Sequence, residues 1–240
     1  MKVKEHYDNH LAGFYSWMIG DFDKAKESFR DFCIKNEIKP SDTGIAIDLG
    51  AGNGIQSIAL GEIGFKVKAV DFNDKLLSEL KQKIKGLPIE AIKDDIKNIS
   101  SINHVPVDLI TCCGDTVTHL ETFEQLDKLI KDCYDSLKDN GKLILSFRDY
   151  SVASTDTQRF IPVKSDDNRI LTCVVDYFDT KITVTDLLHE KINGQWIQKT
   201  SSYDKLRLKP DNMIKMAENT GFSVTGNENI NRMIHLTLKK

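Results

Sequence analysis

The chain has 240 residues, of which 40% are hydrophobic and 29% are charged, and its formal net charge at pH 7 is −3. This composition is that of an ordinary globular protein, and the length suits one domain with an insertion or two small domains. The small negative charge creates no broad positive field that would attract nucleic acid or an anionic membrane, so a small-molecule partner is expected.

Five cysteines are spread along the chain without the spacing of a zinc site or a disulfide framework. No metal site is therefore predicted, and a reducing, cytoplasmic location is expected. The first residues, Met-Lys-Val-Lys-Glu-His-Tyr, lack the apolar stretch of a signal peptide. No run of the sequence approaches the roughly 18 apolar residues of a membrane span, so we expect neither secretion nor membrane insertion.

The first forty residues predict helices. Apolar side chains recur at steps of three or four between residues 5 and 36, with an interruption at Gly20 and Asp21, which indicates two short amphipathic helices. The apolar run from Gly44 to Leu49 then predicts the first buried strand, and a glycine-rich turn follows it.

Helices and strands alternate after that turn. This order predicts right-handed crossovers and a parallel sheet covered on both faces, and such a sheet binds ligands beyond the carboxyl ends of its strands. The predicted segments are a helix at 55–64, a strand at 66–71, a helix at 74–85, strands at 89–92 and 107–112, a helix at 122–138 and a strand at 142–147.

The pattern changes after Asp149, where β-rich runs are joined by short turns at Asp179-Thr180 and Asn193-Gly194. These runs predict antiparallel strands. The predicted segments of this part are strands at 170–178, 181–191 and 195–208, a helix at 210–220, and a final antiparallel edge pair formed by 222–224 and 233–238.

The turn Asp48-Leu49-Gly50-Ala51-Gly52-Asn53-Gly54 joins the first strand to the next helix. Glycines there let the backbone pass close to a ligand, and free amides at a helix start favour an acceptor or a carboxylate. Asp71 ends the next strand, where a carboxylate can accept hydrogen bonds from both hydroxyls of a ribose. Asp95 follows the third strand, in a suitable position for a polar contact to adenine.

A Gly-x-Gly-x-Gly turn alone is a weak signal, because a tight turn that only packs a helix on a strand has the same pattern. A nicotinamide-dependent oxidoreductase also needs a glycine turn and a ribose-binding acid, but its usual spacing is Gly-x-Gly-x-x-Gly. A non-catalytic module that keeps the nucleoside site is a third alternative.

The set formed by the glycine turn, Asp71, Asp95-Ile96 and the Asn140-Gly141 turn resembles the class I S-adenosylmethionine-dependent methyltransferases over residues 44–148. The resemblance implies an α/β fold with a Rossmann-like seven-stranded sheet, mostly parallel, that ends in an antiparallel hairpin. It also implies S-adenosyl-L-methionine as cofactor, with its methionine part at the glycines, its ribose on Asp71 and its adenine beside Phe72. The cofactor-binding residues expected on this basis are Asp48, Gly50, Ala51, Gly52, Gly54, Asp71, Phe72, Asp95, Ile96 and Cys112, together with Tyr7 and Tyr15.

Four further stretches, at 15–21, 113–120, 147–150 and 203–208, resemble the glycine N-methyltransferase type within that superfamily. That type implies methyl transfer to the amine of a small amino acid, a lid of N-terminal helices and an antiparallel insertion after strand five. The expected organisation is a helical lid at 1–40, a cofactor-binding core at 41–148, an antiparallel β insertion at 149–208, and the final helix and strand hairpin of the core at 209–240.

Four residues are candidates for positioning the methyl acceptor. The resemblance implies a carboxylate-binding arginine at Arg148, with a salt bridge to a nearby acid as the alternative. His119 matches a position near the cofactor, where a hydrogen-bonding wall is favoured over a base. Asp115 replaces an asparagine of the glycine enzymes, so we expect a more negative pocket that prefers a cationic acceptor, unless the carboxylate only caps a helix. Tyr177 on the insertion is the fourth candidate.

Aromatic and sulfur-containing residues add two expectations. Tyr7, Tyr15 and Trp17 are placed to close over a sulfonium, whose positive charge suits ring faces, or to serve as core residues of their helices. Cys112 and Cys113 end the fourth strand beside the expected cofactor, where packing is favoured over metal chemistry.

Methyl transfer from a sulfonium is an in-line displacement, so the protein must mainly hold an acceptor lone pair near the methyl group and exclude water. The sequence therefore predicts a methyltransferase acting on the amine of an amino-acid-like small molecule, with an O-methyltransferase of a small metabolite as the nearest alternative. Asp115, His119 or a tyrosine hydroxyl could assist proton removal. The oligomeric state stays open, a homo-oligomer included.

Overall fold

The structure is a computed structural model that describes residues 3–230 and 232–240. These residues form a central seven-stranded sheet in the order β10-β11-β5-β4-β1-β2-β3. The five strands β1 to β5 are parallel, and β11 is antiparallel to both of its neighbours, which confirms the expected sheet with a reversed terminal hairpin. The strands are β1 (Ile45–Leu49), β2 (Lys66–Asp71), β3 (Ile89–Lys93), β4 (Val107–Cys112), β5 (Leu137–Phe147), β10 (Ser223–Ile230) and β11 (Met233–Lys239).

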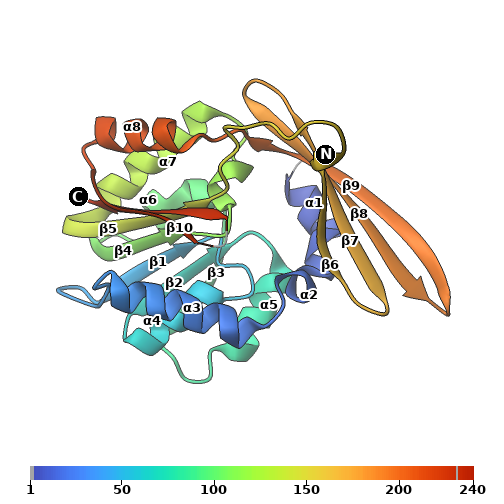
Figure 1. Cartoon of the computed structure of the whole chain (residues 1–240). Coiled ribbons are helices and arrows are strands. Elements are labelled where there is room, and N and C mark those ends of the chain that lie inside the picture. The colour runs from blue at the N-terminus through green and yellow to red at the C-terminus, as the bar shows by residue number, and fades with distance from the viewer. Residues whose placement is uncertain (1–2, 231) are drawn as a thin grey trace.

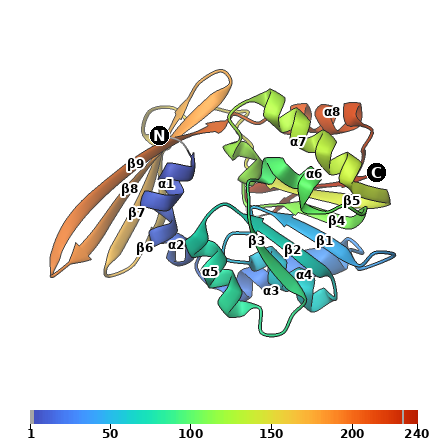
Figure 2. The ribbon, with the colours of Figure 1, turned by 180° about the vertical axis from the view of Figure 1, so that it is seen from behind.

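Helices cover both faces of this sheet, as Figures 1 and 2 show from opposite sides. Successive strand residues point to opposite faces, so Ala46 and Leu109 pack on one side while Ile47 and Ile110 pack on the other. Burial on both sides explains why these strands read as continuous apolar runs. One face carries α3 (Phe22–Lys35), α4 (Ile55–Ile63) and α5 (Asp74–Lys83), and the other carries α6 (Ile99–Ile102), α7 (Phe123–Ser136) and α8 (Pro210–Thr220).

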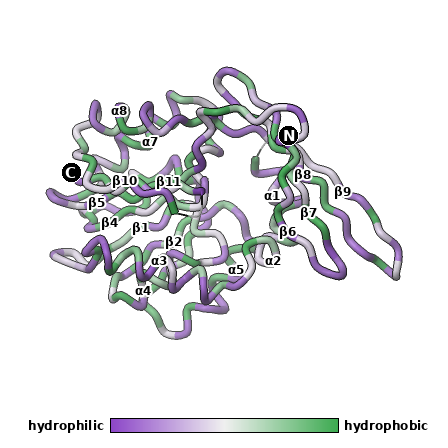
Figure 3. Tube along the Cα trace, viewed as in Figure 1, coloured by the Kyte–Doolittle hydropathy of each residue, from purple (hydrophilic) through white to green (hydrophobic). Residues whose placement is uncertain are grey.

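The long helices of the core begin at side-chain caps. Asp21, Asn73 and Thr122 each accept a hydrogen bond from the backbone N–H three residues later, at 3.0, 3.0 and 3.2 Å, at the starts of α3, α5 and α7. Polar and apolar residues alternate along α3 in Figure 3, as expected for a helix with one buried face. Local sequence therefore sets both where these helices begin and which side they bury.

Several elements differ in their bounds from the sequence-based prediction. Strand β10 runs to Ile230 instead of ending at Val224, because it pairs with β11 along its length, and α5 ends at Lys83 instead of Lys85. The helix α7 ends at Ser136 instead of Lys138, because the buried Leu137 already pairs with Val107 as the first residue of β5. The N-terminal part has a 3-10 helix at Leu11–Gly13 between α1 (Val3–Asn9) and α2 (Tyr15–Ile19). This break lets Leu11 and Phe14 pack against the insertion.

The insertion is a separate four-stranded antiparallel sheet in the order β6-β7-β8-β9. The prediction missed its edge strand β6, because Pro162 and a register shift next to it interrupt the pattern of a strand. One face of the sheet packs on α1, which lies between the insertion and the core in Figure 1. Its strands are β6 (Phe160–Ser165), β7 (Arg169–Tyr177), β8 (Lys181–Ile192) and β9 (Gln195–Leu206).

The side chain of Arg207 joins the two segments that connect the insertion to the core. Its guanidinium donates hydrogen bonds to the carbonyl oxygens of Tyr150, Ser151 and Phe178, at 2.9, 3.0 and 3.1 Å. Tyr150 and Ser151 lie on the segment that leaves the core, and Arg207 lies on the segment that returns to it. The guanidinium therefore fixes the entry and the exit of the insertion side by side.

All five cysteines are free thiols. Across residues 3–230 and 232–240, no helix combines the length and the apolarity that crossing a membrane would require.

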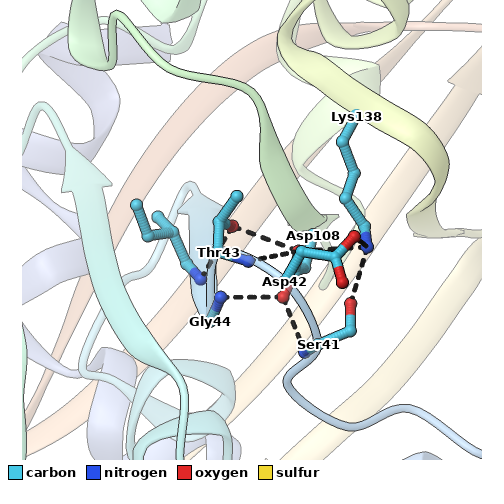
Figure 4. Close-up of polar contacts among 7 residues, drawn as sticks. Ser41, Asp42, Thr43, Gly44, Asp108 and Lys138 are labelled. Atoms are coloured by element: carbon cyan, nitrogen blue, oxygen red, sulfur yellow. Dashed lines mark hydrogen bonds and ion pairs between the residues drawn. The ribbon is translucent and has the colours of Figure 1, made fainter.

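Asp108 organises the edge of the sheet opposite the carboxyl ends of the strands. Its carboxylate accepts hydrogen bonds from the backbone N–H groups of Ser41, Thr43 and Gly44, at 2.7, 3.2 and 2.9 Å, and lies 3.5 Å from Lys138 Nζ (Figure 4). Burial by itself would raise the pKa of Asp108, but these hydrogen bonds outweigh burial and lower it. The charged carboxylate thus stabilises the link between the N-terminal helices and β1.

Replacing Asp108 with asparagine removes this charge and leaves backbone donors poorly paired. We expect D108N to lower the free energy of unfolding at pH 7 by about 2–4 kcal/mol, measured by urea denaturation. The matched control is D42N, because the Asp42 side chain is 83% exposed and also pairs with Lys138. Loss of that exposed pair should cost less than about 1 kcal/mol.

The wild type and D108N also provide a test of pH dependence. Because the folded pKa of Asp108 lies below its unfolded value of about 3.9, its contribution is complete above that value and is lost as the pH falls through the folded pKa. The stability difference between wild type and D108N should therefore shrink below about pH 4. A stability difference that stays constant as the pH falls to the point of acid unfolding would contradict this role of Asp108.

Candidate functional site

A cavity of about 780 Å³ opens at the carboxyl ends of the parallel strands. It lies where the core, the N-terminal helices and the insertion meet. Its lining residues come from four places: α1 and α2 (Val3, Lys4, Glu5, Tyr7, Tyr15), the first half of the core (Gly50, Gly52, Asp71, Phe72, Leu76, Asp95, Ile96, Lys97), the segment after β4 (Gly114, Thr116, His119, Leu120, Glu121, Gln125), and the insertion (Lys181, Asp204, Lys205, Leu206).

The glycine turn forms part of the cavity wall, through Gly50 and Gly52. Gly50 has φ +73°, and a Cβ atom there would lie 2.4 Å from the Thr116 side chain. At Gly52 a Cβ atom would point toward the Tyr15 hydroxyl, 3.6 Å away across the cavity wall. Gly52 therefore leaves the backbone open at the cavity, as predicted, whereas the missing side chain at Gly50 makes room for Thr116.

Two other members of the turn lie outside the cavity, contrary to the prediction. A Cβ atom at Gly54 would lie 2.3 Å from Leu80 Cδ1, so this glycine is required for packing of α5 and not for a ligand. Ala51 is buried, and its N–H donates to Val70 O at 2.9 Å.

Asp48 also lies outside the cavity wall, although it was expected to bind cofactor. Its carboxylate is buried and accepts hydrogen bonds from Ser57 Oγ at 2.5 Å and Thr111 Oγ1 at 2.8 Å. Burial raises its pKa to about 6. The Asp48 side chain therefore links β1 to α4 and β4, and it supports the glycine turn without lining the cavity.

Asp71 lines the cavity at the end of β2. Its carboxylate accepts hydrogen bonds from the N–H groups of Gly52 and Asn73, both at 2.8 Å, and burial raises its pKa. Phe72, Asp95 and Ile96 lie along the same wall. The structure thus brings the predicted ribose-binding acid and the predicted adenine-binding residues into one cavity.

The N-terminal helices supply two aromatic rings to the cavity. Tyr7 lies edge-on to Phe72, with ring centroids 5.5 Å apart, and Tyr15 lies beside Gly52. Burial raises the pKa of Tyr15 to about 12, and it also raises the pKa of Tyr7 well above its usual range. Trp17 does not reach the cavity, because its indole N–H donates to Asp166 of the insertion.

Helix α1 is held against the insertion by His6, which is completely buried. Its Nδ1 atom lies 2.8 Å from Ser201 Oγ, and its ring stacks on Tyr203 with centroids 4.0 Å apart. The helix predicted as a lid is therefore a wall fixed to the insertion sheet.

Asp115 is buried below the cavity and does not line it. Its Oδ1 accepts the N–H of Arg148 at 2.9 Å, and its Oδ2 accepts the Tyr150 hydroxyl at 2.8 Å and Lys205 Nζ at 2.6 Å. The expectation that Asp115 makes the pocket more negative is wrong, because Lys205 neutralises its charge. The alternative of a helix cap is also wrong, since its side chain caps no helix.

Lys205 on β9 is the charged residue that the sequence analysis missed. Its side chain is 10% exposed and lines the cavity. Burial disfavours its charge, but attraction to Asp115 outweighs burial and raises the pKa of Lys205, while the pKa of Asp115 is lowered. The period of two in the strand 195–208 places Lys205 on the same face as Tyr203, which is the signal that could have indicated it.

Three predicted residues lie away from the cavity. Arg148 is exposed directly after β5, and Cys112 is completely buried within β4. Burial raises the pKa of Cys112 well above its usual range, so this thiol is a packing residue. Tyr177 lies under the Arg207 guanidinium, 5.5 Å from the ring centroid.

His119 lines the cavity beside Tyr7, whose hydroxyl lies 3.4 Å from His119 Nε2. Its Nδ1 atom is buried and has no hydrogen-bond partner in the described part of the chain. Burial, reinforced by the nearby charge of Lys205, lowers the pKa of His119 to about 3. The imidazole is therefore neutral at physiological pH.

Comparison with known proteins finds similarity to methyltransferases. Residues 46–141 match the family described as a methyltransferase domain. A glycine/sarcosine N-methyltransferase of Halorhodospira halochloris is 28% identical over 151 residues, which are 61% of this chain and 56% of that protein. The chain therefore spans less than two thirds of the length of this relative.

Solved structures share the whole fold. A S-adenosylmethionine-dependent methyltransferase from Clostridium acetobutylicum has a TM-score of 0.73 at 19% identity, with 98% of this chain and 96% of that chain covered. The amino pentose methyltransferase CalS10 from Micromonospora echinaspora has a TM-score of 0.71 at 13% identity, with 93% and 94% covered. These likenesses confirm the predicted methyltransferase fold.

The Asp115–Lys205 pair predicts a specific pattern of stability. We expect K205M to lower the free energy of unfolding by about 3–5 kcal/mol, because it leaves a buried carboxylate without its cation. The double variant D115N/K205M removes both charges and should recover part of that loss, as measured by urea denaturation. A double variant less stable than K205M would contradict the pairing.

Proposed function

We propose that this chain is a class I S-adenosylmethionine-dependent methyltransferase and that it transfers a methyl group from this cofactor to the nitrogen of a small-molecule amine. The main support for this proposal is that the residues expected as candidate bases are poorly suited to take a proton near neutral pH. An amine with a free lone pair attacks without a base, whereas a hydroxyl must lose its proton.

The cavity suits the cofactor because its wall is open where a backbone must approach a ligand. Gly50 and Gly52 would face the methionine part, Asp71 would accept the ribose hydroxyls, and Phe72 with Asp95 and Ile96 would hold the adenine. When bound, S-adenosylmethionine supplies a methyl group on a positively charged sulfur. The rings of Tyr7 and Tyr15 would exclude water from the bound cofactor and offer polarisable faces to that charge.

Each candidate base is unsuited to proton removal for a different reason. Asp115 is held as a carboxylate by Lys205, and its pKa is lowered. His119, with a pKa of about 3, binds a proton too weakly to take one from an ammonium group. Burial raises the pKa values of Tyr7 and Tyr15, so both stay protonated. None of these groups is suited to take a proton, which favours an acceptor that arrives with its lone pair free.

Two of the similar proteins support a nitrogen acceptor. One is named for glycine and sarcosine N-methylation, and the other is named for an amino pentose. These acceptors differ widely in shape, but each is a small molecule that carries an amine.

We expect radiolabelled S-adenosylmethionine to transfer its methyl group to members of a panel of small amines and not to alcohols or thiols with the same carbon skeletons.

The D71A variant should bind S-adenosylhomocysteine about 10–100-fold more weakly, because a charged hydrogen-bond acceptor is lost, and should lose transfer in parallel. The control D74N alters an exposed carboxylate at the start of α5 and should leave both unchanged. Transfer to hydroxyls alone would instead identify an O-methyltransferase.

The pH dependence of transfer tests the absence of a base. We expect kcat/KM to rise with pH up to the pKa of the acceptor amine itself, because only the neutral amine reacts. His119 should add no inflection between pH 5 and 8, since it is already neutral there. The H119Q variant should therefore show a profile of the same shape. An inflection near pH 6.5 that H119Q removes would identify His119 as the base after all.

A further inference from the structure

We infer that Lys205 forms an anion-binding subsite on the side of the cavity formed by the insertion, and that this subsite takes a carboxylate of the methyl acceptor. The inference rests on the proposed function and narrows its substrate class to amines that also carry a carboxylate. It assigns to Lys205 the role that the sequence resemblance placed on Arg148.

The position of Lys205 suits this role. Its side chain lies in the wall of the same cavity as Gly50, Gly52 and Asp71, but on the side formed by the insertion. An ammonium group has three N–H donors. In the described part of the chain, Asp115 is the single hydrogen-bond acceptor of Lys205 Nζ, at 2.6 Å. The remaining donors are available to a ligand.

The charges around Lys205 favour an anion. The charges of Lys205 and Asp115 cancel each other. The guanidinium of Arg148 adds a positive charge that acts on Lys205 through space. Lys181 and Asp204 at the cavity rim pair with each other at 2.7 Å, and His119 is neutral. Lys205 therefore faces the cavity as an ammonium group with free N–H donors for a carboxylate, and Arg148 adds a weaker positive field from outside the wall.

Arg148 contributes charge without being in a position to hold the ligand. Its side chain is exposed and is not part of the cavity wall, while its backbone N–H holds Asp115. Asp115 in turn keeps Lys205 charged and fixes its Nζ in place. The aspartate that departs from the family pattern thus acts as a positioning residue for the lysine.

The test uses acetate as the carboxylate probe, titrated by calorimetry into protein saturated with S-adenosylhomocysteine. Wild type should bind acetate, and K205M should bind it at least about tenfold more weakly, because a charge-assisted hydrogen bond is lost. The matched control R148M removes a cation outside the cavity wall and should weaken acetate binding less than about threefold, since it acts only through the surrounding field. Affinity for S-adenosylhomocysteine should stay within about twofold in both variants, because the cofactor contacts are untouched.

The variant K205M leaves Asp115 unpaired and is expected to be less stable, so D115N/K205M provides a second test without the buried charge. This double variant should still bind S-adenosylhomocysteine and still fail to bind acetate. Acetate binding that persists in either Lys205 variant, or that is lost in R148M, would overturn the subsite, as would a wild type that does not bind acetate. Failure of methyl transfer to every amine, with these binding results intact, would overturn the proposed function and leave the anion subsite standing.

Discussion

The ion pair between Asp115 and Lys205 is the interaction on which the site depends. Asp115 belongs to the core and Lys205 to the insertion, so the pair joins the two sheets next to the cavity that lies between them. Tyr150 and the backbone of Arg148 complete the hydrogen bonding of the carboxylate, and the Arg207 guanidinium fixes the connecting segments nearby. A buried pair of this kind adds little net stability over apolar packing, but it costs several kcal/mol to break, and it therefore favours one arrangement of the two sheets.

The chemistry expected of the cavity is positioning and not proton transfer. Burial leaves His119 uncharged and the two tyrosines protonated, and Asp115 is committed to its lysine. A reaction between a sulfonium and a free amine suits such a site, because both partners arrive already activated and need only alignment and exclusion of water. The fixed position of α1 against the insertion contributes to that exclusion.

Much of the fold follows from local sequence. Strands β2 and β4 and helix α8 have the predicted bounds, because their apolar periods and flanking turn residues are unambiguous. Edge strand β6 was missed, since Pro162 breaks its pattern and its pairing with β7 is what defines it. The end of α7 was placed too late because Leu137 suits a helix equally well, and only its contact with β4 makes it a strand residue.

The sequence by itself determined the class of fold, the glycine turn and the approach of Asp71 and Asp95 to one edge of the sheet. These features depend on residue type and spacing within short segments, and parallel strands necessarily bring their carboxyl ends together. Only the tertiary structure decided the partners of Asp115, the exposure of Arg148 and the presence of Lys205 in the cavity. The two members of the ion pair are 90 residues apart, and periodicity indicates which face a side chain occupies but not which distant element covers that face.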